Sequence, residues 1–211
     1  IAADISFTPE GIDFGDVEVG ETSPPATITL TNSGDATLVI TALSISGPDA
    51  SDFNIASDGC SGALVSPGQS CQVQVELTPS GLGEHAATLN VTSNVPGPPR
   101  TAGLAGVGID TTPPQSSWTT GNNAIVISLL QSVGGTTSDL VGVDSASVTF
   151  TDLLGSAMTV PATLTCSNQR RSCSFSATVP LMLPGPATAT INATDTSGNT
   201  SSGPTIMLLV V

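Results

Sequence analysis

The sequence predicts an all-β protein made of two consecutive β-sandwiches. Apolar and polar residues alternate along many short segments, whereas the three-to-four-residue spacing of a helix is nearly absent. Turn-forming Asn, Asp, Gly and Pro residues separate these segments at the spacing of a seven-stranded fold. The four cysteines fall into two pairs, one in each half of the 211-residue chain. At roughly a hundred residues, each half is long enough to bury its own core.

In the first half, alternation predicts strands with one face in a core and the other in water. Threonine, glutamine, glutamate and asparagine occupy the outward positions of these segments. The apolar positions expected to point inward are Ile28, Leu30, Val73, Val75, Leu77, Ala87, Leu89 and Val91. Turns are predicted between the strands, for example at residues 32–35 and 66–69.

The second half repeats this pattern with serine and threonine on the outward side. Its inward positions are expected to be Cys173, Phe175, Ala177, Val179, Ala187, Ala189, Ile191 and Ala193. Turn signals follow at residues 183–185 and 196–199. The same architecture is therefore predicted twice.

The domain boundary is predicted at the end of a glycine-rich strand, residues 103–108. The next segment, Asp110-Thr111-Thr112-Pro113-Pro114, ends in two prolines that fix φ and donate no ladder hydrogen bond. An extended linker is expected there. The predicted domains are residues 1–109 and 110–211.

The cysteines indicate two structural disulfides. Four cysteines allow three pairings, and the pairing of nearest neighbours, Cys60 with Cys71 and Cys166 with Cys173, is favoured because each then closes a loop within one domain. Zinc is the less favoured reading, because the spacing is wrong and the chain has one histidine. Disulfides are typical of exported proteins, so an extracellular, cell-surface location is expected.

Charge and hydropathy exclude several partners. The net charge is −14, with 17 acidic residues against three arginines and no lysine. Such a chain repels nucleic-acid phosphates and anionic lipids, so no nucleic-acid binding is expected. The apolar runs are too short for a transmembrane helix, so no membrane span is expected either.

Several motifs follow one another in a recognisable order through the first half, at residues 5–7, 12–20, 30–36, 52–53, 60–61, 67–71, 77–79 and 104–108. With these motifs the first half resembles the abnormal-spindle/hydin (ASH) type of immunoglobulin-like domain, found also in bacterial exported proteins of the choice-of-anchor D group. The resemblance spans nearly all of residues 4–109 and implies an immunoglobulin-like β-sandwich. It implies no catalytic residue, because members act mainly as repeats, spacers or assembly modules.

The second half is similar, less specifically, to bacterial immunoglobulin-like repeats. The matching segments are residues 110–114, 142–150 and 191–200. Such repeats occur in surface adhesins, in fibres and as accessory modules of secreted enzymes. The resemblance implies a second immunoglobulin-like sandwich and does not choose among these roles.

Residues suited to catalysis are scarce, so the chain is predicted not to be an enzyme. His85 is expected to be a surface histidine at the start of a strand rather than a catalytic base. Paired carboxylates of the glycosidase type are disfavoured, because the acids gather at predicted turns, where capping of backbone amides explains them. These acids are Asp35, Asp49, Asp52 and Asp58.

No cofactor is expected, and calcium is the best candidate if there is one. The segment Asp195-Thr196-Ser197-Gly198-Asn199 offers oxygens at alternating positions. It lacks the run of acids and the distal glutamate of a calcium loop, so a plain turn is favoured.

Three sequons provide candidate N-glycosylation sites at Asn90, Asn192 and Asn199. Alternation predicts outward-pointing side chains at Asn90 and Asn192. Chance occurrence in a threonine-rich chain, or O-linked decoration, is favoured over N-glycosylation.

The C-terminal run is the candidate assembly element. Its residues are Ile206, Met207, Leu208, Leu209, Val210 and Val211. A strand apolar on both faces needs cover on its second face, which the rest of its own domain or another subunit could supply. The favoured reading makes it the last strand of its own domain, and donation to a neighbour is the alternative. Ile1, Ala2 and Ala3 form a second candidate contact, as a free extension that could pair with a neighbour's sheet edge.

Two functions are carried forward. The first is an exported cell-surface structural protein, a homo-oligomer or polymer such as a filament, pilus or sheath, assembled through β-edges and apolar contacts. The alternative is a spacer or a carbohydrate-binding or adhesion module of a larger secreted protein, with a glycan or surface ligand as partner. Sugar binding is disfavoured because the chain has one tryptophan, Trp118, and no tyrosine. A periplasmic or ciliary scaffold is a weaker reading that rests on the ASH resemblance alone.

Overall fold

A computed structural model describes residues 2–126 and 131–211. The chain forms two compact units, Ile1–Asp110 and Thr111–Val211, next to the boundary predicted after residue 109. They are called the first and second domains below, and each is described by itself. Ile1, a predicted assembly residue, lies outside the described residues.

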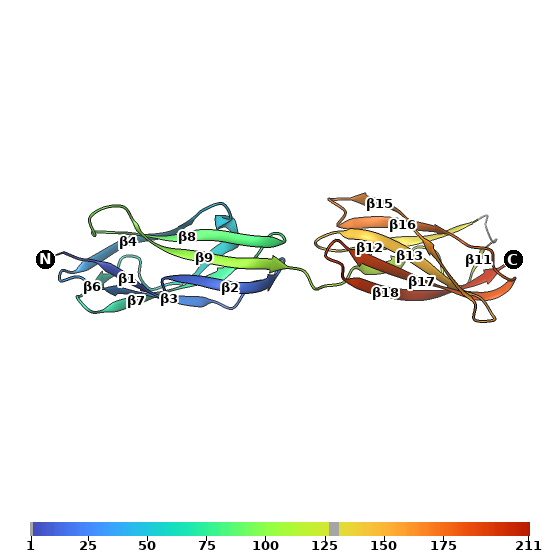
Figure 1. Cartoon of the computed structure of the whole chain (residues 1–211), viewed down its shortest axis with the longest axis horizontal. Helices are drawn as coiled ribbons and strands as arrows, with labels where there is room; N and C mark the ends of the chain where they lie inside the picture. The colour runs from blue at the N-terminus through green and yellow to red at the C-terminus, as the bar shows by residue number, and fades with distance from the viewer. Residues whose placement is uncertain (1, 127–130) are drawn as a thin grey trace. The chain divides into compact units, whose positions relative to one another are not determined.

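The first domain consists of two sheets packed face to face (Figure 1). One sheet has the order β1-β3-β7-β5, with β1 Ile5–Thr8, β3 Ala26–Asn32, β7 Ser70–Leu77 and β5 Phe53–Asp58. The other has the order β2-β9-β8-β4-β6, with β2 Gly11–Glu18, β9 Arg100–Ile109, β8 Gly83–Ser93, β4 Leu38–Ser46 and β6 Leu64–Val65. A single 3-10 turn, η1 Ala50–Asp52, precedes β5.

Alternation produces the core of the first domain as predicted. Ile28 and Leu30 of β3 and Val73, Val75 and Leu77 of β7 are fully buried, and the residues between them are more exposed. The turn between β6 and β7 contains Gly68, whose φ of 73° is a conformation that glycine adopts without steric cost. These aliphatic side chains form one core cluster with residues of the facing sheet, among them Leu89 and Leu104.

The second domain is also a two-sheet sandwich. Its four-stranded sheet has the order β10-β12-β16-β15, with β10 Gln115–Trp118, β12 Ser132–Ser138, β16 Ser172–Thr178 and β15 Thr163–Ser167. Its five-stranded sheet has the order β11-β18-β17-β13-β14, with β11 Ala124–Val126, β18 Thr200–Val210, β17 Gly185–Asp195, β13 Val143–Thr151 and β14 Ala157–Pro161.

The core of the second domain follows the predicted alternation in β16 and β17. Phe175 and Ala177 of β16 and Ala189 and Ile191 of β17 are buried, with exposed or half-buried neighbours between them. Gly135 of β12 lies opposite Phe175 on the neighbouring strand β16, and a Cβ atom at residue 135 would lie 2.7 Å from the Phe175 ring. Glycine at this position therefore lets the ring fill the core.

These sheets confirm the predicted fold class, an all-β protein with two tandem immunoglobulin-like sandwiches. Among the described residues the only helical turn is η1. No helix among residues 2–126 and 131–211 is long and apolar enough to cross a bilayer.

Candidate assembly surface

Exposed large apolar side chains gather on the second domain. In the first domain the exposed examples are Leu64 and Leu82. In the second domain they are Ile125, Leu140, Leu153, Leu154, Met158, Leu181, Leu183, Met207, Leu209 and Val211. An exposed apolar surface commonly marks a contact site. The second domain is therefore the candidate location of an assembly surface.

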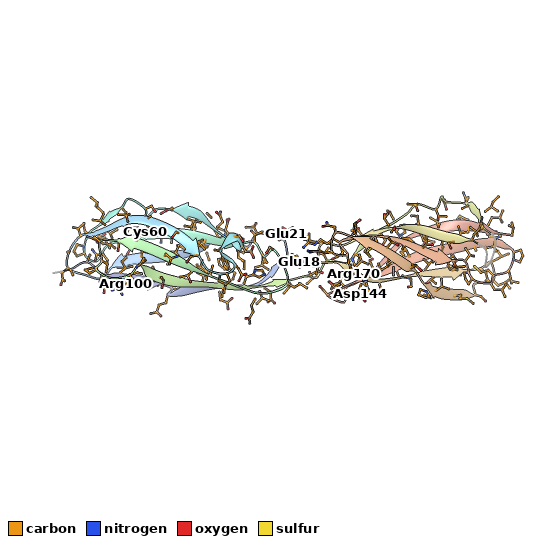
Figure 2. All side chains as sticks on the ribbon, turned by 90° about the horizontal axis from the view of Figure 1, so that it is seen from above. Glu18, Glu21, Cys60, Arg100, Asp144 and Arg170 are labelled. Atoms are coloured by element: carbon orange, nitrogen blue, oxygen red, sulfur yellow. A yellow bond between two sulfur atoms is a disulfide. The ribbon has the colours of Figure 1, made fainter. Side chains whose placement is uncertain are left out.

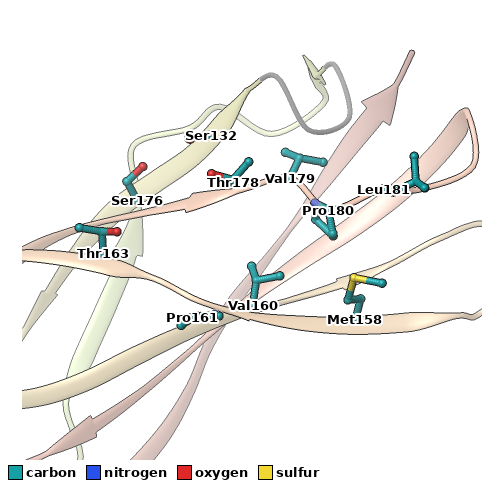
Figure 3. A pocket seen from close by; sticks show the side chains of 10 residues that line it. All are labelled: Ser132, Met158, Val160, Pro161, Thr163, Ser176, Thr178, Val179, Pro180 and Leu181. Carbon is teal, nitrogen blue, oxygen red and sulfur yellow. The ribbon is translucent and has the colours of Figure 1, made fainter.

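A groove of about 610 Å³ opens at one edge of the second sandwich, between β14 and the end of β16. We call it the edge groove. Figure 3 shows Met158 and Val160 on β14 pointing toward the segment that carries Pro180. Its lining residues are Ser132, Met158, Val160, Pro161, Thr163, Ser176, Thr178, Val179, Pro180 and Leu181.

The strand register explains why the groove is open. Met158 and Val160 lie opposite the buried Phe150 and Val148 of β13, so they belong to the inward-facing row of side chains. On the other sheet, the pairing of β15 with β16 stops at Thr163 and Ser176. Among the described strands none continues beside residues 177–178 on that side, so the inward-facing row of β14 remains partly uncovered.

The edge strand β14 carries one of the usual protections against pairing with another chain, Pro161 at its C-terminal end, which donates no ladder hydrogen bond. Four of its five residues are exposed and none is charged. By contrast, the edge strand β2 of the first domain contains Asp13, Asp16 and Glu18 and has a register shift between Asp13 and Asp16. Charges and bulges discourage edge-to-edge pairing, so β14 is the better acceptor of a further strand.

The C-terminal run forms β18, an interior strand between β11 and β17. This agrees with the favoured reading, in which it belongs to its own domain. Ile206, Leu208 and Val210 enter the core, whereas Met207 and Leu209 point outward and are 50% and 42% exposed. Val211, at 57% exposure, follows the end of the strand.

The outward residues of β18 join a second apolar surface at the other edge of the same sheet. Ile125 of β11 is 63% exposed and pairs in register with Leu209. We call Ile125, Met207 and Leu209 the β11 patch. The five-stranded sheet thus carries an apolar surface at each of its edges, the β11 patch at one and the edge groove at the other.

The N-terminal residues are not the free extension that was predicted. The carbonyl oxygen of Ala2 accepts hydrogen bonds from the backbone N–H groups of Asp35 and Ala36, at 2.9 and 3.3 Å. Ala3 is 6% exposed and belongs to the core of the first domain. Backbone pairing and burial therefore fix Ala2 and Ala3 within their own domain.

The cysteines form two disulfides, Cys60–Cys71 and Cys166–Cys173, and no free cysteine is found among the described residues. Cys60 is fully buried in the first domain (Figure 2). Cys166 and Cys173 lie directly opposite each other on β15 and β16. Two disulfides indicate an oxidising compartment.

Asp58 organises the turn beside the first disulfide. Its Oδ1 accepts hydrogen bonds from the N–H groups of Cys60 and Ser61, both at 2.9 Å. Burial raises the pKa of the Asp58 carboxyl, but hydrogen bonds from the Ser61 side chain and from these two N–H groups outweigh it, so the pKa lies below 3.8.

The sequons occupy three different settings. The side-chain nitrogen of Asn90 donates to Ser46 and to the carbonyls of Ser44 and Thr88. That of Asn192 donates to Thr149 across the sheet. Asn199 lies in the turn before β18, where its N–H donates to Asp195. A glycan on Asn90 or Asn192 would replace these hydrogen bonds.

His85 is buried, which corrects the prediction of a surface histidine. It is 6% exposed, its Nδ1 lies 2.7 Å from Oδ2 of the buried Asp52, and its Nε2 is 2.9 Å from the carbonyl oxygen of Gly81. The Ser80 hydroxyl donates to the same Asp52 oxygen at 3.1 Å. Histidine is placed inward here because β8 alternates and Asp52 lies within reach, a contact between distant segments that local sequence does not reveal.

Trp118 is half-buried and packs against the core of the second domain. Its ring meets Phe175 edge-on, with 5.4 Å between ring centroids, and its Nε1 donates to the carbonyl oxygen of Pro204 at 2.6 Å. A sugar-stacking tryptophan needs an open ring face, so Trp118 does not support a carbohydrate site.

Residues 3–106 match the family model of the HYDIN/CFA65/VesB-like, Ig-like domain. This confirms the ASH-type resemblance of the first half. No curated protein matches the sequence.

Several solved structures are similar to parts of the chain. The VesB protease of Vibrio cholerae shares 20% identity at a TM-score of 0.39, over 50% of this chain and 32% of its own. The ASH/PapD-like domain 7 of human CEP192 shares 21% identity at 0.38, over 53% of this chain and 89% of its own. The secreted serine protease VesC of Vibrio cholerae shares 13% identity at 0.40, over 92% of this chain and 49% of its own. The chain thus spans about a third of the VesB chain.

Proposed function

We propose that this protein is an exported structural subunit that polymerises with copies of itself at the cell surface. The observation that carries the proposal is the pair of uncharged apolar surfaces at the two edges of one sheet. The edge groove and the β11 patch are different surfaces, so contact between them is head-to-tail. A head-to-tail contact that does not close into a ring produces an open filament.

Strand addition provides the physical basis of this contact. When β11 of one copy lies beside β14 of the next, the unpaired backbone groups of both edges gain partners and the five-stranded sheet continues across the contact. Ile125 of β11 would then lie beside β14, and the added copy would cover Met158 and Leu181, which are exposed in the single chain. Burial of such side chains contributes about 25 cal/mol per Å² of apolar surface.

We also propose that the chain is not an enzyme. The Asp52–His85–Ser80 group is the arrangement closest to a hydrolytic triad in the described structure. In a triad the serine hydroxyl donates to the histidine, whereas here Ser80 donates to Asp52 and the histidine Nε2 contacts Gly81. This supports a structural role for the three residues.

Assembly is tested by electron microscopy and sedimentation of the purified chain and two charge variants. Met158→Lys combined with Leu181→Lys disables the edge groove, and Ile125→Lys disables the β11 patch. Each variant alone is expected to be monomeric, while an equimolar mixture forms dimers, because one intact groove meets one intact patch. The matched control is Leu64→Lys in the first domain, since Leu64 and Leu181 are both 72% exposed.

Filaments that persist in both variants, or wild-type dimers that do not grow, would contradict the head-to-tail contact. Circular dichroism of each variant checks the fold. Point substitutions are preferable to removal of the C-terminal run, since that removes core residues Leu208 and Val210.

The second candidate function is a spacer module of a larger secreted protein. The family match of the first domain favours it, because VesB, which shares this kind of domain, is described as a protease and the chain covers a third of it. A wild-type chain that stays monomeric at high concentration would support this function against the first.

A further inference from the structure

Asp195 has a buried carboxylate oxygen without a partner. The residue ends β17 and is 2% exposed. Its Oδ1 accepts the N–H groups of Ser197 and Asn199, at 2.8 and 2.9 Å, so the carboxylate is held in one orientation. Its Oδ2 is buried and has no hydrogen-bond partner. A buried, unsatisfied carboxylate oxygen is costly and calls for a cation or a proton.

A second carboxylate faces the same point. Asp139, in the loop between β12 and β13, offers an oxygen within 4.8 Å of that of Asp195. Its Oδ1 accepts the N–H groups of Val141 and Gly142, at 2.8 and 3.0 Å. The two loops are tied together, because the N–H of Thr196 donates to the carbonyl oxygen of Gly142 at 2.9 Å. Two carboxylates are thus positioned side by side by backbone groups.

In the described structure no basic side chain forms a salt bridge with Asp139 or Asp195. The close acid–base contacts found there are His85–Asp52 and Arg100–Asp4. Arg170 lies at the same end of the second domain, beside Asp144 (Figure 2). Its guanidinium donates to the carbonyl oxygens of Val143 and Asp144. Arg171 meets Asp139 through its backbone, since its carbonyl oxygen accepts the N–H of Asp139 at 3.0 Å, and neither arginine forms an ion pair with the two carboxylates in the described structure.

We propose that Asp139 and Asp195 hold a calcium ion in the second domain. All the donors are oxygens, which suit calcium, whereas zinc and copper prefer nitrogen and sulfur. The backbone N–H groups that donate to each Oδ1 fix the orientation of the carboxylates without touching the ion themselves. The turn at residues 195–199 lacks a second acid in its own sequence. Asp139 provides that acid from another loop. This inference is independent of the assembly proposed above.

Calcium itself is the probe. The full chain, treated with a chelator, is titrated with CaCl₂ by calorimetry, and its thermal unfolding is followed with and without calcium. One-to-one binding and a rise in the melting temperature are expected, because a ligand that binds the folded state stabilises it. Asp139→Asn and Asp195→Asn should each weaken binding by roughly tenfold or more.

The matched control is Asp152→Asn. The Oδ1 of Asp152 also accepts hydrogen bonds from two backbone N–H groups, those of Leu154 and Ser156. Its substitution should leave calcium binding unchanged. The wild-type titration decides the question even if a variant misfolds. No heat and no thermal shift at millimolar calcium, or equal stabilisation by magnesium and calcium, would overturn the calcium site.

Discussion

At the residue scale, the buried Asp52–His85 pair is the feature that local sequence reasoning placed wrongly. Asp52 ends η1 and His85 lies on β8, so the two residues are distant in sequence. The tertiary fold brings them together. Sequence predicts which positions of a strand alternate inward, but it does not show which distant polar group will satisfy an inward histidine.

Asp52→Ala should destabilise the first domain by about 3 kcal/mol, because removal of one partner leaves the other buried without compensation. Denaturant unfolding measures the loss, with Asp35→Ala at an exposed turn as the control. A loss of under about 1 kcal/mol, typical of surface substitutions, would show that the pair contributes little.

The Asp58 carboxylate is expected to contribute to the free energy of unfolding in a way that is lost in acid. Its pKa is lower in the folded state than its ordinary 3.8, so the ionised form stabilises the fold. That contribution is complete above the ordinary pKa and disappears as the pH falls through the lowered value. Asp58→Asn should therefore destabilise the protein at pH 7 and have a smaller effect near about pH 2. An equal effect at both values would argue against the charged hydrogen bonds.

At the element scale, the strands could be predicted and their partners could not. The apolar rows of β3, β7, β16 and β17 follow from alternation alone, which is a local property. The open edge at β14 depends on where β15 stops pairing, and the position of Ala2 depends on the turn at Asp35 and Ala36, which is distant in sequence. Both are set by contacts between segments that the sequence does not connect.

Gly34 should hold the N-terminal segment in place. A Cβ atom at residue 34 would overlap the carbonyl oxygen of Ala2 and the backbone nitrogen of Asp4. Gly34→Ala is therefore expected to displace residues 2–4 and to speed hydrogen exchange at the amides of Asp35 and Ala36, which donate to Ala2. Ser93→Ala, on β8, is a suitable control. Unchanged exchange at the two amides would show that the turn adapts without releasing the segment.

At the scale of the whole molecule, the scarcity of basic residues makes proteolysis a simple probe. The chain has three arginines and no lysine. Arg100 lies in β9, paired with β8, whereas Arg170 is exposed in the β15–β16 turn with a φ of 67°. Backbone hydrogen bonds to Val143, Asn168 and Asp139 hold the turn at residues 170–171, but the turn lies outside the continuous ladder that contains Arg100. Trypsin should therefore cut first at residues 170–171, where less structure has to open.

The nick would fall inside the loop closed by Cys166 and Cys173. Electrophoresis should therefore show two fragments under reducing conditions and a single band without reductant. Separate fragments without reductant would contradict this disulfide, and a first cut at Arg100 would contradict the pairing of β9.

The parallel strand pairs give each domain a direction of mechanical strength. In the first domain β2 runs parallel to β9, and in the second β11 runs parallel to β18. Tension that pulls on the start of the earlier strand and the end of the later one slides the two past each other. The hydrogen bonds between them then resist together rather than breaking one after another as in a zipper. Each sandwich is thus suited to transmit a pulling force.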